Sequence, residues 1–254
     1  MIDAHVHVGD WKYFRTNARF PLSAAETLEG LRRRGFSGTV LMPSECKGNE
    51  ELLAEIRNSD FTADFRIFLF PWVHPGNRED THFLKVHRRE VSGIKIHPSL
   101  DRTPLTDPGY HRALSLAEDL QLPVLVHCGQ WRETAGYEKV LHIAEKRPGI
   151  VLIMAHMGGD GYELKRQAAR KVKDSGLTNI YMDTAGTHEN WILEECVAAL
   201  GAHRFLMGSD WPIREPLLYP VLVRNSRLSE EEKERILGIN AWTLLCKGKT
   251  EPVE

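Results

Sequence analysis

A short apolar run followed by an amphipathic stretch recurs eight times along this chain, and that rhythm constrains the fold more than any other feature. The runs are rich in Val, Ile, Leu and Phe, and most are too short to be helices. Continuous apolar runs of this length are typical of strands that are buried on both faces of a parallel sheet. The predicted strands cover residues 2–8, 38–42, 65–73, 93–97, 123–128, 150–157, 179–184 and 204–209.

Segments with helical periodicity separate these runs. Residues 23–34 place Ala24, Leu28 and Leu31 on one stripe, and Ser23 with Glu26 fits a capping box. Residues 107–120 open with Asp-Pro, which is a helix-start signal. Similar patterns predict helices at 137–146, 161–175, 188–200 and 229–245, with weaker patterns at 50–58 and 79–89 and an ambiguous, proline-broken stretch at 214–227.

Eight alternations of strand and helix predict an α/β fold, a single (β/α)8 TIM barrel that occupies residues 1–254 as one domain. A doubly wound open sheet has the same rhythm. However, no GxGxxG follows the first strand and no GxxxxGK[ST] occurs, so the nucleotide-binding versions of that fold lack support. Residues 246–254 are polar, and we expect them to form a frayed tail.

Composition and charge argue against several classes of function. The 33 basic and 35 acidic residues provide no basic field, so we expect no nucleic-acid partner. No apolar run approaches the roughly 20 residues of a membrane span, and the first residues lack a signal-peptide pattern, so we expect no membrane partner and a cytoplasmic location. Cys46, Cys128, Cys196 and Cys246 form no CxxC pair, which favours reduced thiols over a disulfide scaffold.

Five of the predicted strands end in a His or an Asp beside a Gly- or Pro-containing turn. These residues are His5 and His7, His97, His127, His156 and Asp210. In a barrel, the chemistry takes place at the carboxyl ends of the strands. His5 and His7 lie two residues apart on one strand and therefore project from the same face.

Each of these side chains, taken alone, is readily explained as a partly exposed polar residue, a satisfied core histidine or a turn residue. A cluster of them is harder to explain, because three buried histidines that face an aspartate are costly unless something compensates them. A divalent cation does so, and open coordination positions beside a carboxylate are the usual arrangement for activating water near neutral pH.

Several motifs occur in a fixed order along nearly the whole chain. They are DAHVH at 3–7, GIKIHP at 93–98, His127 at the end of its strand, HMGG at 156–159, GSDWP at 208–212 and GINAWTLL at 238–245. As a set they resemble the amidohydrolase superfamily. More narrowly, they resemble its amidohydrolase-related group, which includes aminocarboxymuconate semialdehyde decarboxylase.

The resemblance implies a metal centre with His5, His7, His127 and Asp210 as ligands. It also implies that Asp210 is a general base, and that His156 polarises water or stabilises a developing oxyanion, which makes these two the expected catalytic residues. The implied metal is zinc. Three nitrogens and one carboxylate oxygen also suit manganese, iron or cobalt.

Lys95 admits several interpretations. Some members of the superfamily carboxylate a lysine at the end of the fourth strand and use it to bridge two metal ions. Alternatively, an unmodified ammonium group pairs with a substrate carboxylate, or the lysine has only a structural partner. We expect one divalent ion and a substrate-binding Lys95; two ions would require the carboxylated form.

Residues just beyond the predicted strand ends are candidates for the substrate pocket. Trp131 suits a planar substrate and Arg132 suits a carboxylate, so both are expected to bind the substrate. Trp11, Trp72, His74, Gln130, Asp183 and Trp211 fall in similar places, although packing of the barrel mouth explains each of them equally well.

The residues and the resemblance together favour a metal-dependent hydrolase that attacks a C–N or C–O bond of a small molecule through metal-activated water. The alternative is a non-oxidative, metal-dependent decarboxylase of an aromatic or unsaturated carboxylate, because the same ligands serve both reactions. A third hypothesis is an inactive barrel that binds a small molecule without stoichiometric metal. A small-molecule substrate is the expected partner, and we also expect a homodimer.

Overall fold

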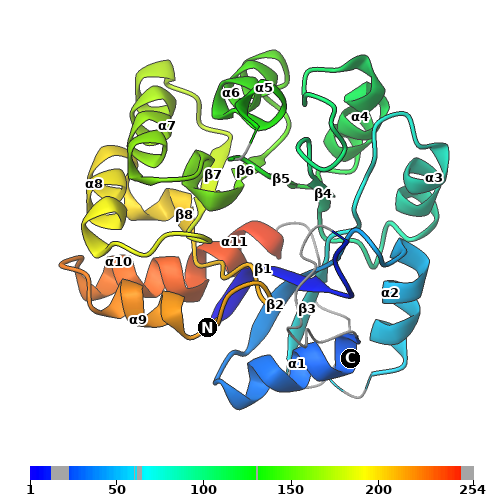
Figure 1. The fold of residues 1–254 in the computed structure, drawn as a ribbon, viewed down its shortest axis with the longest axis horizontal. Coiled ribbons are helices and arrows are strands. Elements are labelled where there is room, and N and C mark those ends of the chain that lie inside the picture. Colours follow the sequence, from blue (N-terminus) through cyan, green and yellow to red (C-terminus); the bar gives the residue numbers. More distant parts are fainter. Residues whose placement is uncertain (13–22, 60, 62–64, 130, 247–254) are drawn as a thin grey trace.

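Eight parallel strands form the centre of the molecule in the part of the chain that the structure describes, a computed structural model of residues 1–12, 23–59, 61, 65–129 and 131–246. They pair in chain order, first as β1-β2-β3 and then as β4-β5-β6-β7-β8 (Figure 1). The strands are β1 (Ile2–Val8), β2 (Gly38–Pro43), β3 (Arg66–Leu69), β4 (Ile94–Ile96), β5 (Val124–Val126), β6 (Leu152–Met154), β7 (Ile180–Asp183) and β8 (Phe205–Leu206).

Backbone hydrogen bonds join the two sheets at both seams and close the barrel. At one seam, the N–H of Ala4 donates to the carbonyl of Met207 over 2.8 Å, and that of His7 donates to the carbonyl of Trp211 over 2.7 Å. At the other seam, the N–H of Lys95 donates to the carbonyl of Pro71 over 2.8 Å. The predicted (β/α)8 barrel is therefore confirmed.

Most of the helices surround the strands as an outer ring, whereas the last one lies near the centre and packs against the apolar interior of the barrel (Figure 1). They are α1 (Ala24–Arg33), α2 (Asn49–Arg57), α3 (Arg78–Val86), α4 (His111–Asp119), α5 (Arg132–Ala135), α6 (Tyr137–Lys146), α7 (Tyr162–Ser175), α8 (Asn190–Leu200), α9 (Leu218–Arg224), α10 (Glu230–Glu234) and α11 (Asn240–Leu245). The capping box of Ser23 and Glu26 is present at the start of α1. The ambiguous stretch contains α9, and the expected helix at 229–245 consists of α10, a π-helical turn and α11.

Strand β1 changes the side that its side chains face because it contains one extra residue. Asp3 lies opposite Thr39 and Val6 lies opposite Leu41, so β1 advances three residues while β2 advances two. Before this bulge, Ile2 and Ala4 pack inside the barrel. After it, Val6 and Val8 join the core between strands and helices. The residues between them, His5 and His7, therefore point inward.

Two apolar cores account for the burial of the strands. The larger core lies between the strands and the helix ring. The smaller one fills the inside of the barrel and includes Leu125 and Ile153 from the strands together with Ala241, Leu244 and Leu245 of α11. The same helix thus packs against the apolar interior, while the polar residues that follow the strands gather at the carboxyl end of the barrel.

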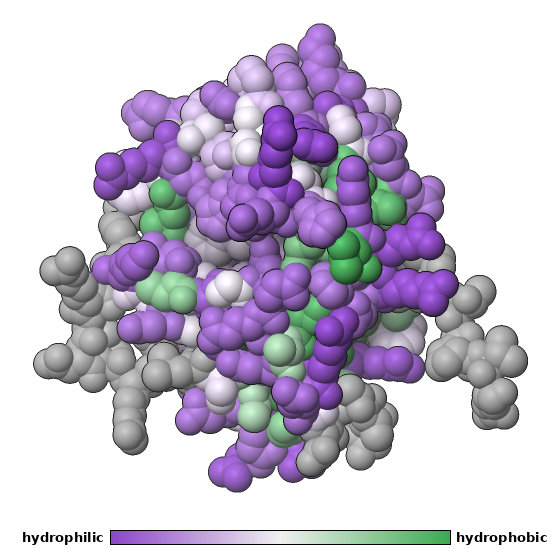
Figure 2. Space-filling model, turned by 90° about the vertical axis from the view of Figure 1, so that its right-hand side faces the viewer, coloured by the Kyte–Doolittle hydropathy of each residue, from purple (hydrophilic) through white to green (hydrophobic). Residues whose placement is uncertain are grey.

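The surface on the side of α2, α3 and α4 is ordinary. Hydrophilic side chains dominate this face, and hydrophobic ones form small separate groups between them (Figure 2). Scattered groups of this kind are usual on protein surfaces. Among the described residues, no helix combines the length and the apolar character that crossing a membrane requires. Most of the expected C-terminal tail, residues 247–254, falls outside the described residues.

Candidate metal centre

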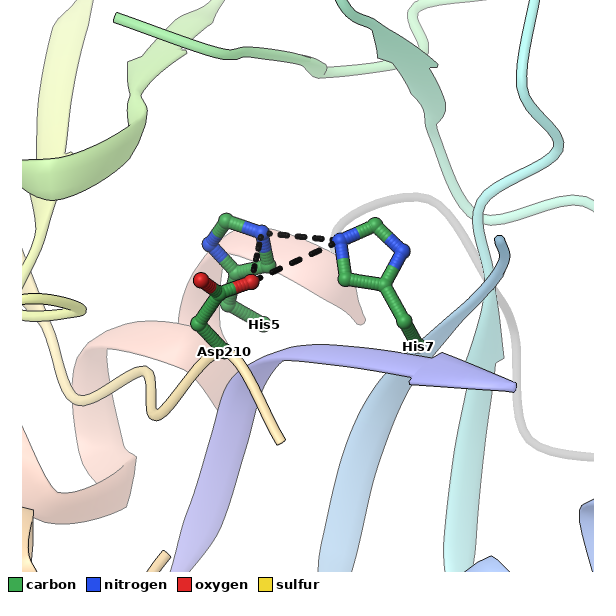
Figure 3. A group of neighbouring side chains, drawn as sticks. All are labelled: His5, His7 and Asp210. Atoms are coloured by element: carbon green, nitrogen blue, oxygen red, sulfur yellow. Dashed lines mark hydrogen bonds and ion pairs between the residues drawn. The ribbon is translucent and has the colours of Figure 1, made fainter. Parts of the chain in front are cut away.

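His5 and His7 of β1 meet Asp210, which follows β8, at the carboxyl end of the barrel (Figure 3). The Nε2 atoms of the two histidines lie 3.2 Å apart. Oδ1 of Asp210 lies 3.5 Å from Nε2 of His5 and 3.7 Å from Nε2 of His7. All three residues are buried, so three potential ligand atoms from two distant parts of the sequence converge with little exposure to solvent.

The atoms that converge are unprotonated acceptors rather than hydrogen-bond donors. Nδ1 of His7 donates to the carbonyl of Pro43 over 3.0 Å, and Nδ1 of His5 lies 2.8 Å from Oδ2 of Asp183. Burial lowers the pKa of both imidazoles well below 6.5, so each ring carries one proton, and these contacts place it on Nδ1. The lone pairs on Nε2 therefore face one another and the carboxylate.

The spacing of these atoms fits a divalent ion. Ligand atoms bound to zinc at about 2.0–2.2 Å with tetrahedral angles lie roughly 3.3–3.6 Å from one another. The observed separations of 3.2, 3.5 and 3.7 Å are close to that range. Among these three atoms only Nε2 of His5 has a donor, Nζ of Lys95, and a cation would offset the cost of burying the converging lone pairs. His5, His7 and Asp210 could therefore hold a metal ion.

Lys95 of β4 is fully buried, and its Nζ lies 3.2 Å from Nε2 of His5. Burial lowers its pKa, whereas the carboxylates of Asp210 and Asp183 raise it. The side chain lines the cavity beside the candidate ligands. This position is compatible with both interpretations of Lys95, as a partner of the substrate carboxylate and as a carboxylated bridge to a second ion.

His127 and His156 form a second pair next to the first cluster. Nε2 of His156 lies 3.2 Å from Nδ1 of His127, and the ring centroids of His156 and His5 are 5.4 Å apart. The ring of His127 also stacks on that of His97, with centroids 3.8 Å apart. His127 thus belongs to the site but not to the group formed by His5, His7 and Asp210, and its role as a ligand stays a prediction.

Three of the expected site residues have left-handed backbone conformations. The φ angles are +57° at His156, +66° at Asp210 and +64° at Trp131. Such conformations cost side-chain-bearing residues roughly 1–3 kcal/mol each and tend to persist at functional sites. Since the surrounding fold holds three of them at one end of the barrel, the backbone independently marks this region as a functional site.

A cavity with about 470 Å³ of empty space opens above the cluster. Its lining residues are His5, His7, Trp11, Lys95, His97, Ser99, Leu100, His127, Trp131, His156, Asp210 and Ile213. Trp131 lies where the sequence predicted it. Arg132 does not line this cavity, because it begins α5 and its guanidinium forms an ion pair with Glu138 at the surface. Gln130 lies outside the described residues.

Sequence reasoning missed several lining residues. Ser99, Leu100 and Ile213 carry no chemical signal that distinguishes them from ordinary loop residues. Asp183, a candidate for the substrate pocket or for packing of the barrel mouth, instead accepts a hydrogen bond from the imidazole of His5. The available signal was its position next to the last residue of the predicted strand 179–184.

His74 lies beside the cavity, in a second cluster of titratable groups. Its Nδ1 is 2.9 Å from Oδ2 of Asp80, and its Nε2 is 3.9 Å from Oδ1 of Asp101. Its ring also stacks on that of Trp72. Burial lowers the pKa of His74, but the hydrogen bond to Asp80 and the charges of Asp101 and Asp80 outweigh this effect, and the pKa is raised overall.

This raised pKa predicts a pH-dependent contribution to stability. A group with a raised pKa in the folded state stabilises the protein below its unfolded pKa of 6.5, and this contribution is lost as the pH rises through the folded value. We therefore expect His74→Gln to lower the melting temperature more at about pH 6 than at about pH 9. His82→Gln, on the exposed face of α3, is the control. Equal effects of His74→Gln at both pH values would contradict the prediction.

Known structures and sequences share this architecture. The gamma-resorcylate decarboxylase of Polaromonas sp. (strain JS666 / ATCC BAA-500) is 28% identical over 115 residues, which are 39% of this chain and 35% of the relative. The match thus spans about a third of that relative's length. An amidohydrolase from Burkholderia multivorans with bound zinc has a TM-score of 0.75 and 14% identity, with 96% of this chain and 98% of that chain covered.

A second solved structure is similar over almost the whole chain. It is a dihydroxybenzoic acid decarboxylase from Polaromonas sp. JS666 with bound manganese and the inhibitor 2-nitroresorcinol, with a TM-score of 0.72 and 15% identity, covering 98% of this chain and 97% of that one. At these identities the likeness shows the fold alone. The sequence model of the family described as amidohydrolase matches residues 2–245, and the chain belongs to this family of metal-dependent enzymes.

Proposed function

We propose that this protein is a non-oxidative, metal-dependent decarboxylase of a small aromatic or unsaturated carboxylate. The observation that carries the proposal is the placement of three buried metal-ligand atoms and one buried ammonium group at the floor of a single cavity. The similarity to a gamma-resorcylate decarboxylase and a dihydroxybenzoic acid decarboxylase supports it over hydrolysis, which the sequence had favoured.

The cavity residues fit a planar, anionic substrate. Trp11 and Trp131 provide apolar walls that suit a flat ring, and Ile213 and Leu100 extend them. The ammonium group of Lys95 attracts a carboxylate as a compact point charge. Because Lys95 is fully buried, its charge is poorly screened by water, which strengthens its electrostatic contact with the substrate.

The reaction exchanges a carboxylate for a proton. A ring carbon gains a proton, the bond to the carboxylate carbon breaks, and its electron pair stays with the ring while CO₂ leaves. When bound, the ion supplies positive charge that orients the substrate and stabilises the negative charge that develops. As a candidate ligand, Asp210 would bind the ion as a carboxylate, and we propose that it passes a proton from water to the ring carbon.

His156 is the second polar group that faces the substrate. Burial, followed by the charge of His5, lowers its pKa to about 3, so its ring is neutral. Nδ1 lies 3.3 Å from the carbonyl of Ala185, which suits donation from Nδ1 and leaves Nε2 as an acceptor. Nε2 lies 3.2 Å from Nδ1 of His127 in this structure, so we propose that the substrate or the proton donor takes the place of His127 as the donor to Nε2. Zinc stays the proposed metal, with His127 as a further ligand beside His5, His7 and Asp210. Manganese suits the same nitrogen and carboxylate donors.

An assay of released products tests the proposal. Protein stripped with a chelator and reloaded with Zn²⁺ or Mn²⁺ is incubated with hydroxybenzoates, including gamma-resorcylate, and in parallel with amide and lactone substrates. We expect CO₂ from the carboxylates and about one equivalent of bound ion, since one group of candidate ligands occurs among the residues that the structure describes. Asp210→Ala, treated in the same way, is the control for contaminating activity.

The other outcomes distinguish the competing functions. Release of amine or acid without CO₂ would replace the proposal with a hydrolase of C–N or C–O bonds, which the bound zinc of the Burkholderia amidohydrolase favours. No stoichiometric ion and no turnover with either metal would instead support a barrel that only binds a small molecule.

A further inference from the structure

Asp183 ends β7 at the centre of the barrel and is completely buried. Its two carboxylate oxygens have separate partners. Oδ2 lies 2.8 Å from Nδ1 of His5. Oδ1 accepts hydrogen bonds from the backbone N–H of His156 over 2.9 Å and from that of Ala185 over 3.1 Å. One side chain therefore connects a candidate metal ligand on β1 with the start of the turn that carries His156.

The contacts of His5 define which of its nitrogens carries the proton. The carboxylate of Asp183 can only accept, so Nδ1 of His5 must donate to it. On the opposite side of the ring, Nζ of Lys95 lies 3.2 Å from Nε2, and an ammonium group can only donate. Both contacts require the same tautomer of His5, with the proton on Nδ1 and an unprotonated Nε2 that can accept a hydrogen bond or bind an ion.

We propose that Asp183 is a positioning residue that fixes His5 in the tautomer required for metal binding and, through Oδ1, holds the turn of His156 at the same site. This inference rests on the proposed metal-dependent function. Asp183 itself is not assigned as a ligand, because its two oxygens already face His5 and the backbone. A hydrogen-bonded carboxylate behind a ligating histidine typically raises metal affinity in this way.

The substitution Asp183→Asn tests the tautomer directly because the amide can adopt only one favourable orientation. Two backbone N–H donors face the position of Oδ1, so the amide oxygen must lie there. The amide NH₂ then faces Nδ1 of His5 and donates to it, which moves the imidazole proton to Nε2. That proton points at Nε2 of His7 and Oδ1 of Asp210, where the ion would bind.

The substitution Asp183→Ala separates this effect from loss of packing. Alanine removes more contacts than asparagine does, but it leaves His5 free to adopt either tautomer. If Asp183 acts through the tautomer, asparagine is the more harmful replacement for metal binding. If Asp183 serves only packing, alanine is at least as harmful.

A matched control comes from Asp3, a second fully buried carboxyl group in the same barrel. Its Oδ1 accepts from the backbone N–H groups of His5 over 3.2 Å and Ser209 over 2.9 Å, and no imidazole contact is made. Asp3→Asn thus replaces a buried carboxyl group with an amide near the site without presenting a new donor to an imidazole ring.

The experiment measures two quantities in the full-length protein. Zn²⁺ affinity is determined by competition with a chromogenic chelator. The tautomer of His5 in the metal-free protein is determined by ¹⁵N NMR of the imidazoles, with the signal assigned by its loss in His5→Gln. We expect Asp183→Asn to weaken Zn²⁺ binding by about 10–100-fold and to move the proton of His5 from Nδ1 to Nε2. Asp183→Ala should weaken binding less, and Asp3→Asn should leave it close to wild type.

Two results would overturn the inference: a proton on Nε2 of His5 in the metal-free wild type, or a Zn²⁺ affinity of Asp183→Ala that is equal to or lower than that of Asp183→Asn. The wild-type tautomer decides the question even if a variant fails to fold. Failure of the proposed function looks different: the wild type would bind no Zn²⁺, while the imidazole signals would still report whether Asp183 sets the tautomer.

Discussion

Replacing Asp210 with alanine is expected to abolish stoichiometric metal binding and to lower turnover by at least roughly 10³-fold, since a bound ion supplies several kcal/mol of charge stabilisation. The variant loses the only carboxylate of the candidate ligand group and leaves two imidazoles 3.2 Å apart, which cannot hold the ion alone. Metal content after dialysis and the rate of product release check both effects. Full activity in the variant would refute the assignment of the metal centre.

Asparagine at the same position separates loss of the ligand from loss of stability. Asp210 has a φ angle of +66°, a left-handed conformation that Asn adopts more readily than Ala. We therefore expect Asp210→Asn in chelator to melt closer to the wild type than Asp210→Ala does, while both variants lose the ion. If Asp210→Asn melts far below the wild type, its loss of activity reflects unfolding.

The second large effect is expected at Gly93, just before β4. A Cβ atom built there would lie 2.2 Å from Cζ of Phe70, whose ring is fully buried inside the barrel. Real Cβ atoms do not approach other atoms so closely, so the ring must move within a packed core. Overpacking of this kind costs about 1–3 kcal/mol and occasionally more, and we place Gly93→Ala at about 3 kcal/mol of lost unfolding free energy.

Denaturant unfolding of two further variants makes this prediction specific. Gly48→Ala is the control, because a Cβ atom at Gly48 meets nothing within 4 Å. Phe70→Leu combined with Gly93→Ala should recover part of the lost stability, since the smaller side chain makes room at the contact. If Gly93→Ala unfolds at the same denaturant concentration as Gly48→Ala, the close packing of Phe70 on Gly93 does not exist in solution.

The architecture was predictable from the sequence because the fold depends on periodicity. All eight predicted strands form, and the barrel that they imply is confirmed. The ends of the strands were less predictable. Residues 65–73 read as one strand, yet β3 contains only Arg66–Leu69, because Pro71 removes a donor and the chain then follows β4 through an isolated bridge at Trp72.

The sequence predicts which residues of the candidate site lie at the ends of strands, but it does not predict where each side chain points. His5, His7 and Asp210 meet as expected because β1 lies beside the segment that follows β8 in one closed barrel. His127 contacts His156 and His97 instead, since proximity at a strand end does not determine the direction of an imidazole ring. Arg132 turns to Glu138 because it begins a helix at the surface, and a pairing six residues along the chain leaves no mark in the sequence pattern.

The extra residue in β1 has a consequence for protein engineering. It lets one continuous strand direct aliphatic side chains into the barrel at its start and two imidazoles into the barrel at its end. Without the extra residue, even-numbered and odd-numbered residues of the strand would face opposite sides throughout. In a strand without the extra residue, histidines three and five positions after an inward-facing aliphatic residue would point at the surrounding helices. A His-x-His pair transplanted into such a strand would have to replace aliphatic residues of the inward-facing set instead.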